Sequence, residues 1–173
     1  MENLTLQYIL NRRSVRKYQP QKVPKDIITD LLKAAMNAPT ACNQQCWHFV
    51  VIENKEILKD LSSIHGGYHT LKNSPLAILV CGEPGTAILE CFWEQDCAAA
   101  SENILIAAQS FDLGAVWLGV NPTAKEESGM ITKFLHLPEH IKPFSIISLG
   151  YPAGPVDTQC KYDEGKIHYD GKW

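Results

Sequence analysis

One stretch of this sequence limits the possible folds more than any other. Between Thr86 and Phe111 apolar residues recur at helical spacing, and from Ala98 to Ala108 they occupy much of the helix circumference. A helix that is apolar on most sides has to be buried. The pattern therefore predicts a long central helix that packs on a sheet or on another subunit. Gly114 follows it and suits a left-handed helix cap.

Four short apolar and β-branched runs predict strands, at residues 47–52, 76–81, 115–120 and 144–149. We expect the first of them to be covered on both faces, and the second to be buried. Further helices are predicted at residues 4–10, from Pro24 to before Pro39, from the capping residue Asn54 onward, and at 124–135. The paired glycines within residues 65–69 favour a loop.

The length of 173 residues fits a single domain spanning 1–173. A net charge of −3 argues against a nucleic-acid binder, and no apolar run is long enough to span a bilayer. The N-terminal residues do not resemble a secretion signal, so we expect a cytoplasmic protein with reduced cysteines.

The arginines are clustered although the lysines are spread along the chain. The only three, Arg12, Arg13 and Arg16, lie within five residues, and the window from Arg12 to Lys25 holds six basic residues and no acidic one. Such a window is often a solvated surface stretch. It also suits an anion site, because a guanidinium pairs with phosphate oxygens through two hydrogen bonds.

The last residues differ in character from the rest. From Tyr151 onward the chain is rich in glycine and charge, has no apolar stripe, and yet ends in Ile167, Tyr169 and Trp173. One interpretation is a disordered tail. The aromatic end favours the other, an arm over residues 152–173 that packs on another surface.

Five motifs, in this order, resemble those of the nitroreductase family of FMN-dependent flavoproteins. They are residues 12–18 (RRSVRKY), 38–49 (APTACNQQCWHF), 93–103 (WEQDCAAASEN), 113–119 (LGAVWLG), and the C-terminal pattern of 137–139 (LPE), 149–152 (LGYP) and 161–173. The resemblance implies an α+β fold, a three-layer α/β/α sandwich with a central, mainly antiparallel sheet. It also implies an intertwined homodimer with two FMN sites at the interface, in which the arm crosses to the partner.

The resemblance assigns most of the expected cofactor contacts. Arg12 and Ser14 should hold the FMN phosphate, with Arg13 beside them and Lys161 as a further cation. Arg16 matches the basic residue near N1 and the C2 carbonyl of the flavin. The backbone of Leu118 and Gly119 is the expected neighbour of N5, and no catalytic side chain is expected because the chemistry takes place on the flavin.

A second set of contacts is expected to come from the partner subunit: Pro39, Thr40, Ala41 and Asn43. Here the sequence departs from the family, which commonly has Gly at Cys42 and Pro at Cys46. Either cysteine could have a redox-active thiol, or could serve only as a small apolar residue. Together with His48 they do not complete a tetrahedral ligand set, so no metal is expected.

The loop that holds His65, Tyr68 and His69 is expected to border the substrate side, although a lone loop histidine is more often a surface residue. The implied activity is two-electron, ping-pong hydride transfer from NADH or NADPH to nitroaromatics, quinones or a related small acceptor. The alternatives are a flavin carrier or redox sensor, dehalogenation or flavin-ring chemistry in the same fold, and a non-flavin binder of anions or nucleic acid.

Overall fold

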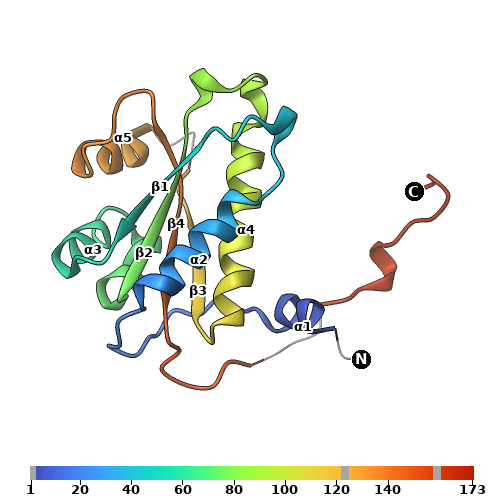
Figure 1. Ribbon diagram of the computed structural model, residues 1–173, viewed down its shortest axis with the longest axis horizontal. Helices are drawn as coiled ribbons and strands as arrows, with labels where there is room; N and C mark the ends of the chain where they lie inside the picture. The colour runs from blue at the N-terminus through green and yellow to red at the C-terminus, as the bar shows by residue number, and fades with distance from the viewer. Residues whose placement is uncertain (1–2, 122–124, 158–160) are drawn as a thin grey trace.

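The computed structural model describes residues 3–121, 125–157 and 161–173 (Figure 1). The helices and strands, in chain order, are α1 (Leu4–Asn11), α2 (Lys25–Met36), β1 (Trp47–Ile52), α3 (Lys55–Leu61), β2 (Leu76–Gly82), α4 (Trp93–Ser110), β3 (Gly114–Gly119), α5 (Lys125–Phe134) and β4 (Lys142–Gly150). The predicted helices and strands are thus present, with shifted ends. Asn54 caps α3 as predicted, since its side chain accepts hydrogen bonds from the N–H groups of Glu56 and Ile57.

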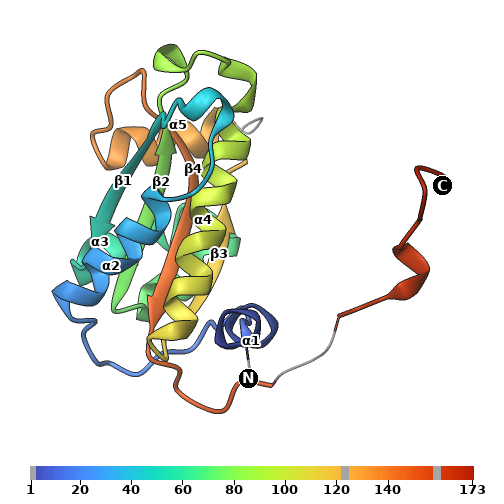
Figure 2. The ribbon, with the colours of Figure 1, turned by 45° about the vertical axis from the view of Figure 1, so that its right-hand side comes forward.

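The four strands form one sheet in the order β1-β2-β4-β3, and every neighbouring pair is antiparallel. Alternate residues of β2 belong to two separate cores, because successive side chains of a strand point to opposite faces. Ile78 and Val80 pack with α2 and α4, whereas Ala77 and Leu79 pack with Leu58, Tyr68 and Ile131 on the other face. Figure 2 shows α2 and α4 in front of the strands, and Figure 1 shows α3 and α5 on the other side of the sheet from α4, which confirms the three-layer α+β prediction.

Strand β1 is an edge strand, and the expectation that it is covered on both faces was wrong. Its side chains alternate unevenly, with Trp47 and Ile52 buried and His48 and Val51 exposed. The strand pairs with β2 on one side only. Its place at the sheet edge leaves part of it facing solvent.

Helix α4 confirms the predicted central helix but begins at Trp93, not at Thr86. Two 3₁₀ turns, Pro84–Thr86 and η4 (Glu90–Phe92), precede it. They take the place of the first part of the predicted helix. Only Gln95 and Ser110 of α4 are exposed. The helix lies on the sheet beside α2 and also contacts α1.

Gly114 does not cap the helix in a left-handed conformation as predicted. Asp112 takes the positive φ, 56°, whereas Gly114 starts β3. A Cβ on Gly114 would lie 2.6 Å from the Cβ of Val15, closer than real contacts allow. Glycine is needed here because another segment of the chain packs directly on its backbone.

Residues 65–69 are more regular than the predicted loop. They lie at the start of a 3₁₀ helix, η2 (Gly66–Asn73), and the His65 side chain accepts a hydrogen bond from the N–H of Gly67. Tyr68, Thr70 and Leu71 are buried beneath it. Burial of these three side chains fixes a segment that its glycines alone would leave flexible.

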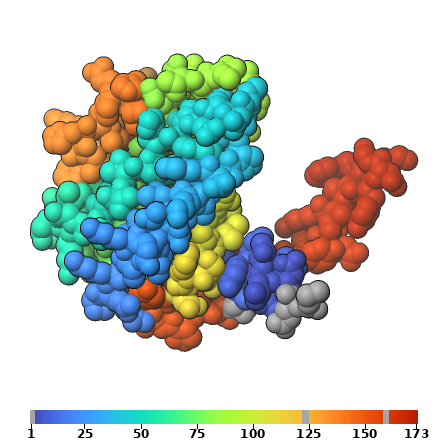
Figure 3. Space-filling model, in the orientation of Figure 1, coloured from blue at the N-terminus to red at the C-terminus, as the bar shows by residue number. Residues whose placement is uncertain are grey.

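The C-terminal segment leaves the body of the protein after β4. Residues 152–153 still pair with Lys17 and Tyr18, but every residue from 161 to 173 is exposed, and Trp173 is 102% exposed. Figure 3 shows this stretch as a lobe that stands away from the rest. Within the described residues, no helix has the length and hydropathy needed to cross a membrane.

Candidate functional site

The Ser14–Lys17 segment lies along the outer edge of β3 and is held there by hydrogen bonds. The N–H of Val15 donates to the carbonyl of Ala115 at 2.9 Å, and Ser14 and Ala115 form a parallel bridge. The Thr70 hydroxyl donates to the carbonyl of Arg16 at 3.0 Å. The segment is therefore fixed on both sides, by β3 and by η2.

Tyr18 anchors the end of this segment. Its hydroxyl lies 2.6 Å from the carbonyl oxygen of Val15 and 3.0 Å from that of Ser148, while the Ser148 hydroxyl donates to it at 3.1 Å. Burial raises the pKa of Tyr18 to about 12. The neutral phenol thus has a structural role, because it links the segment to Ser148 of β4.

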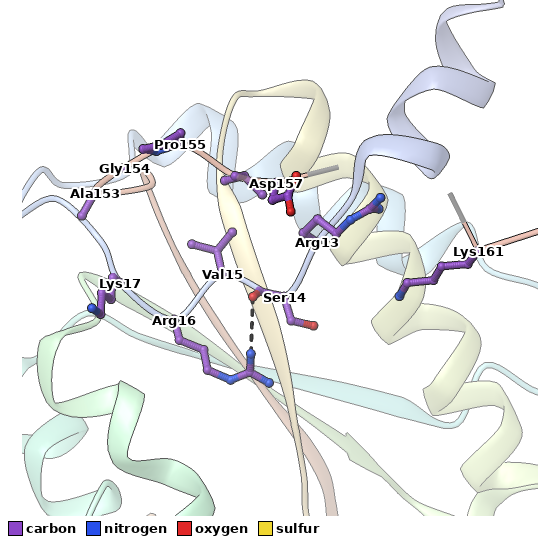
Figure 4. A pocket seen from close by; sticks show the side chains of 11 residues that line it. Arg13, Ser14, Val15, Arg16, Lys17, Ala153, Gly154, Pro155, Asp157 and Lys161 are labelled. Carbon is purple, nitrogen blue, oxygen red and sulfur yellow. Dashed lines mark hydrogen bonds between the residues drawn. The ribbon is translucent and has the colours of Figure 1, made fainter. Parts of the chain in front are cut away.

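A cavity of about 580 Å³ opens beside the Ser14–Lys17 segment (Figure 4). Its lining residues are Arg13, Ser14, Val15, Arg16, Lys17, residues 153–157 and Lys161. Four of the side chains are cationic, and Asp157 is the one acid among the described residues that line it. The donor set suits a phosphate-bearing ligand, which needs charge-assisted hydrogen bonds.

The structure separates the neighbouring arginines. Arg13 and Arg16 line the cavity, and the Arg16 guanidinium lies 3.4 Å from the carbonyl oxygen of Ser14. Arg12 instead points toward α4, where its Nε lies 3.4 Å from a carboxylate oxygen of Glu102. Arg12 therefore does not line the cavity in a single chain.

The outer edge of β3 presents further backbone groups beyond the point where Ser14 and Val15 pair with Ala115. The Val120 N–H donates to the Phe144 carbonyl of β4, whereas the Ala115 carbonyl accepts from Val15 on the other side. Because groups alternate along an antiparallel strand, the N–H of Gly119 points to the open edge. A Cβ on Gly119 would meet only the Trp117 indole, at 3.8 Å, so a planar ligand can approach closely there.

The predicted substrate-side residues lie at the same edge but differ in exposure. Tyr68 is 1% exposed, and its hydroxyl contacts the Gly119 carbonyl at 3.2 Å and the Glu127 carboxylate. Burial and this carboxylate raise the pKa of Tyr68. His65 and His69 are exposed on the surface above it. The tyrosine thus supports the edge of β3, and only the histidines face outward.

Pro39, Thr40, Ala41 and Asn43 lie far from the cavity in the same chain, at the opposite end of α4 (Figure 1). The length of α4, 18 residues, corresponds to about 27 Å. Ala41 and its neighbour Gln44 both donate to the buried carboxylate of Asp96, at 2.9 and 2.5 Å. One chain therefore does not bring the two predicted sets of contacts together.

The segment after Ala41 has an unusual backbone. Cys42, Asn43 and Gln45 have φ of 49°, 52° and 46°, a conformation that costs free energy in residues other than glycine. This explains physically why glycine suits the position of Cys42. Strained segments of this kind concentrate at functional sites.

The thiols of the described residues divide into two groups. Cys42 and Cys91 are exposed, whereas Cys46, Cys81 and Cys97 are buried, and burial raises the pKa of each buried thiol. Cys46 lies 3.8 Å from the Asp96 carboxylate, which disfavours its thiolate further. Among the residues that the structure describes, no cluster of His, Cys, Asp and Glu could hold a metal.

Sequence reasoning missed three supporting residues: Thr70, Asp96 and Lys17. Asp96 left a usable signal, since an acid within an apolar helix has to find partners when buried. Lys17 belongs to the basic window that suggested an anion site, whereas Thr70 left no signal, because its role depends on contact between distant segments.

Comparison with known proteins is consistent with this architecture. The sequence matches the Nitroreductase family over residues 9–67 and 69–151. A Methanothermobacter thermautotrophicus protein provisionally named NADH dehydrogenase/NAD(P)H nitroreductase is 44% identical, over 97% of this chain and 87% of its own length.

Two solved structures resemble the whole chain. One, from Clostridium acetobutylicum and provisionally named an NADH oxidase, is 42% identical with a TM-score of 0.92, covering 95% of this chain and 99% of the other. An FMN-dependent nitroreductase from Clostridium difficile is 29% identical with a TM-score of 0.90, covering 96% and 99%. Sequence and fold thus agree, and the chain belongs to the nitroreductase family.

Proposed function

We propose that this protein is an FMN-dependent oxidoreductase that takes hydride from NADH or NADPH and reduces a small acceptor such as a quinone or a nitroaromatic compound. The observation that carries the proposal is the cationic cavity beside the Ser14–Lys17 segment, which is itself bridged to the outer edge of β3. The residues present fit FMN, because cations and a hydroxyl suit its phosphate and the uncrowded Gly119 suits its flat ring. When bound, FMN would supply two-electron hydride chemistry.

Each of the following site residues then has a defined role. Ser14, Arg13 and Lys161 bind the phosphate with charge-assisted hydrogen bonds. Arg16 places a positive charge beside the ring edge on which negative charge develops, which favours reduction. The Gly119 N–H would donate a hydrogen bond from the strand edge to the flavin ring. Tyr68, below it, holds the Gly119 carbonyl and keeps the edge in place.

We further propose that the site is completed by a second copy of the chain, which supplies the Pro39–Asn43 segment. Three observations support this: the two sets of contacts lie at opposite ends of α4, the segment itself is strained, and the exposed arm ends in unburied aromatic side chains. Exposed Leu4 and Leu10 of α1 add further apolar surface. A homodimer would bury these groups.

FMN titration of the purified protein tests the cofactor assignment. Arg16→Ala should weaken FMN binding about tenfold or more, since it removes one charged hydrogen-bonding group. Arg16→Lys should retain part of the affinity. Lys22→Ala is the matched control, because it lowers the charge of the same basic window without lining the cavity. A wild-type chain that takes up no FMN would refute the proposal.

Mixing two variants that are each weakened in FMN binding tests the shared site. If Arg16 and Asn43 of different chains meet at one FMN, then Arg16→Ala and Asn43→Ala chains, refolded together, should regain about a quarter of the intact sites. At limiting FMN, each variant alone should oxidise NADH or NADPH with a quinone acceptor much more slowly than the wild type. No recovery in a mixture shown by sedimentation to be dimeric would contradict the shared site.

A further inference from the structure

A second cavity adjoins the proposed FMN cavity and is not used by the function described so far. Its volume is about 480 Å³, within the range of small-molecule sites. Arg16 and Lys17 line both cavities, so the two lie next to each other at these residues. In Figure 4 the residues Arg16 and Lys17 lie on the side of the first cavity that is away from Lys161.

The second cavity collects positive charge from three segments of the chain. Arg16 and Lys17 come from the segment that lies along β3, Lys55 is the first residue of α3, and Lys72 belongs to η2. None of the described residues that line it is acidic. Like charges gathered in this way repel one another, and an anion bound between them would offset this repulsion.

Some surface lysines already have an acidic partner. Lys33, Lys59 and Lys166 each lie within 4.0 Å of a carboxylate three residues away. Within the described ranges, Lys55 and Lys72 have no such ion pair. Their charges are therefore available to a ligand.

The hydroxyls at the base of the second cavity are already engaged. The Ser74 hydroxyl contacts the carbonyl oxygens of Leu76 and Leu149, and that of Tyr18 contacts Val15 and Ser148. The binding capacity that remains is mainly cationic, with the exposed Asn73 amide beside it. Such a donor set selects a compact, multiply charged anion, and a phosphomonoester fits that description.

We infer that the second cavity binds the 2′-phosphate of NADPH and so favours NADPH over NADH. NADPH differs from NADH by this one phosphomonoester, and a coenzyme that reaches the first cavity can extend past Arg16 into the second. The inference rests on the proposed function and names the coenzyme specificity of that site. Lys55 and Lys72 are the specificity residues, and neither lines the FMN cavity.

The test uses the FMN-loaded protein and the double variant Lys55→Gln/Lys72→Gln. The probes are 2′,5′-ADP, which carries the 2′-phosphate, with 5′-AMP and inorganic phosphate as comparisons, measured by calorimetry. Lys22→Gln/Lys25→Gln is the matched control, since it removes the same charge from residues outside both cavities. Coenzyme oxidation with a quinone acceptor provides KM for NADPH and for NADH.

The expected result is a loss of 2′,5′-ADP affinity by roughly ten- to hundredfold in the Lys55/Lys72 variant, with a similar rise in KM for NADPH and little change for NADH. Unchanged affinity, an equal loss in the control, or equal effects on both coenzymes would overturn the inference. Absence of FMN uptake defeats the proposed function itself. Normal FMN uptake and flavin reduction with unaltered 2′,5′-ADP binding defeats only the present inference.

Discussion

Replacing Gly114 with alanine should disturb the fold and the site together. The added Cβ would lie 2.6, 2.7 and 2.8 Å from the Cβ, Cγ1 and Cγ2 of Val15, whereas ordinary contacts begin near 3.4 Å. The two backbones cannot move apart freely, because the Val15 N–H is bonded to Ala115, the residue after Gly114. Overpacking of this kind costs about 2 to 3 kcal/mol.

The expected result of Gly114→Ala is a fall in Tm of about 5–10 °C, given the usual scaling for a chain of this length. FMN affinity should fall as well, because Val15 lies between Ser14 and Arg16. Gly129→Ala is the matched control. That glycine lies in α5 with nothing within 4 Å of its added Cβ, so alanine there should stabilise by up to about 1 kcal/mol.

A second substitution identifies the clash as the cause. Val15→Gly removes all three crowded atoms and should recover much of the stability lost in Gly114→Ala. Val15→Ala should recover less, because it leaves the closest atom, Cβ, in place. Urea denaturation of the single and double variants measures the coupling. A double variant whose loss equals the sum of the two single losses would refute the reasoning, as would a fully stable Gly114→Ala protein.

Three further variants test the supports of the site. Cys42→Gly should stabilise by about 1 kcal/mol in urea denaturation, because glycine accepts a φ of 49° without strain; an unchanged or lower midpoint contradicts this. Asp96→Asn should cost about 2 kcal/mol, since one donor, from Ala41 or Gln44, would face an amide N–H₂; Glu94→Gln in the same helix turn is the control and should cost far less. Burial raises the pKa of Tyr18 to about 12, above the unfolded value of about 10, so its stabilisation is complete below pH 10 and is lost as pH rises through 12. The stability difference between wild type and Tyr18→Phe should therefore shrink by about 2–3 kcal/mol over that range, and a constant difference would exclude the burial argument.

The strands and helices could be predicted largely because they depend on near neighbours in the chain. The β2 run, the Asn54 cap and the apolar circumference of α4 are all visible within a few residues. The start of α4 was misplaced because the 3₁₀ turns before Trp93 have apolar residues at compatible spacing. Local periodicity does not distinguish such turns from a helix.

The candidate site was predictable in its chemistry and less so in its geometry. Clustered arginines beside Ser14 indicated an anion site, and the cavity there is indeed cationic. Which of Arg12 and Arg13 faces it could not be predicted, because the two differ only in how the chain turns at the end of α1. The resemblance of the motifs fixed the family without placing these side chains.

The sequence by itself therefore determined the elements, the family and the positive charge of the site, since these follow from residue type and short-range spacing. The tertiary structure decided that β1 and β3 are the sheet edges and that Gly114 has to accommodate Val15. It also decided that the Pro39–Asn43 segment lies at the far end of α4 from the cavity. Such facts concern distances between residues far apart in the chain, and only the packing of the complete fold sets those distances.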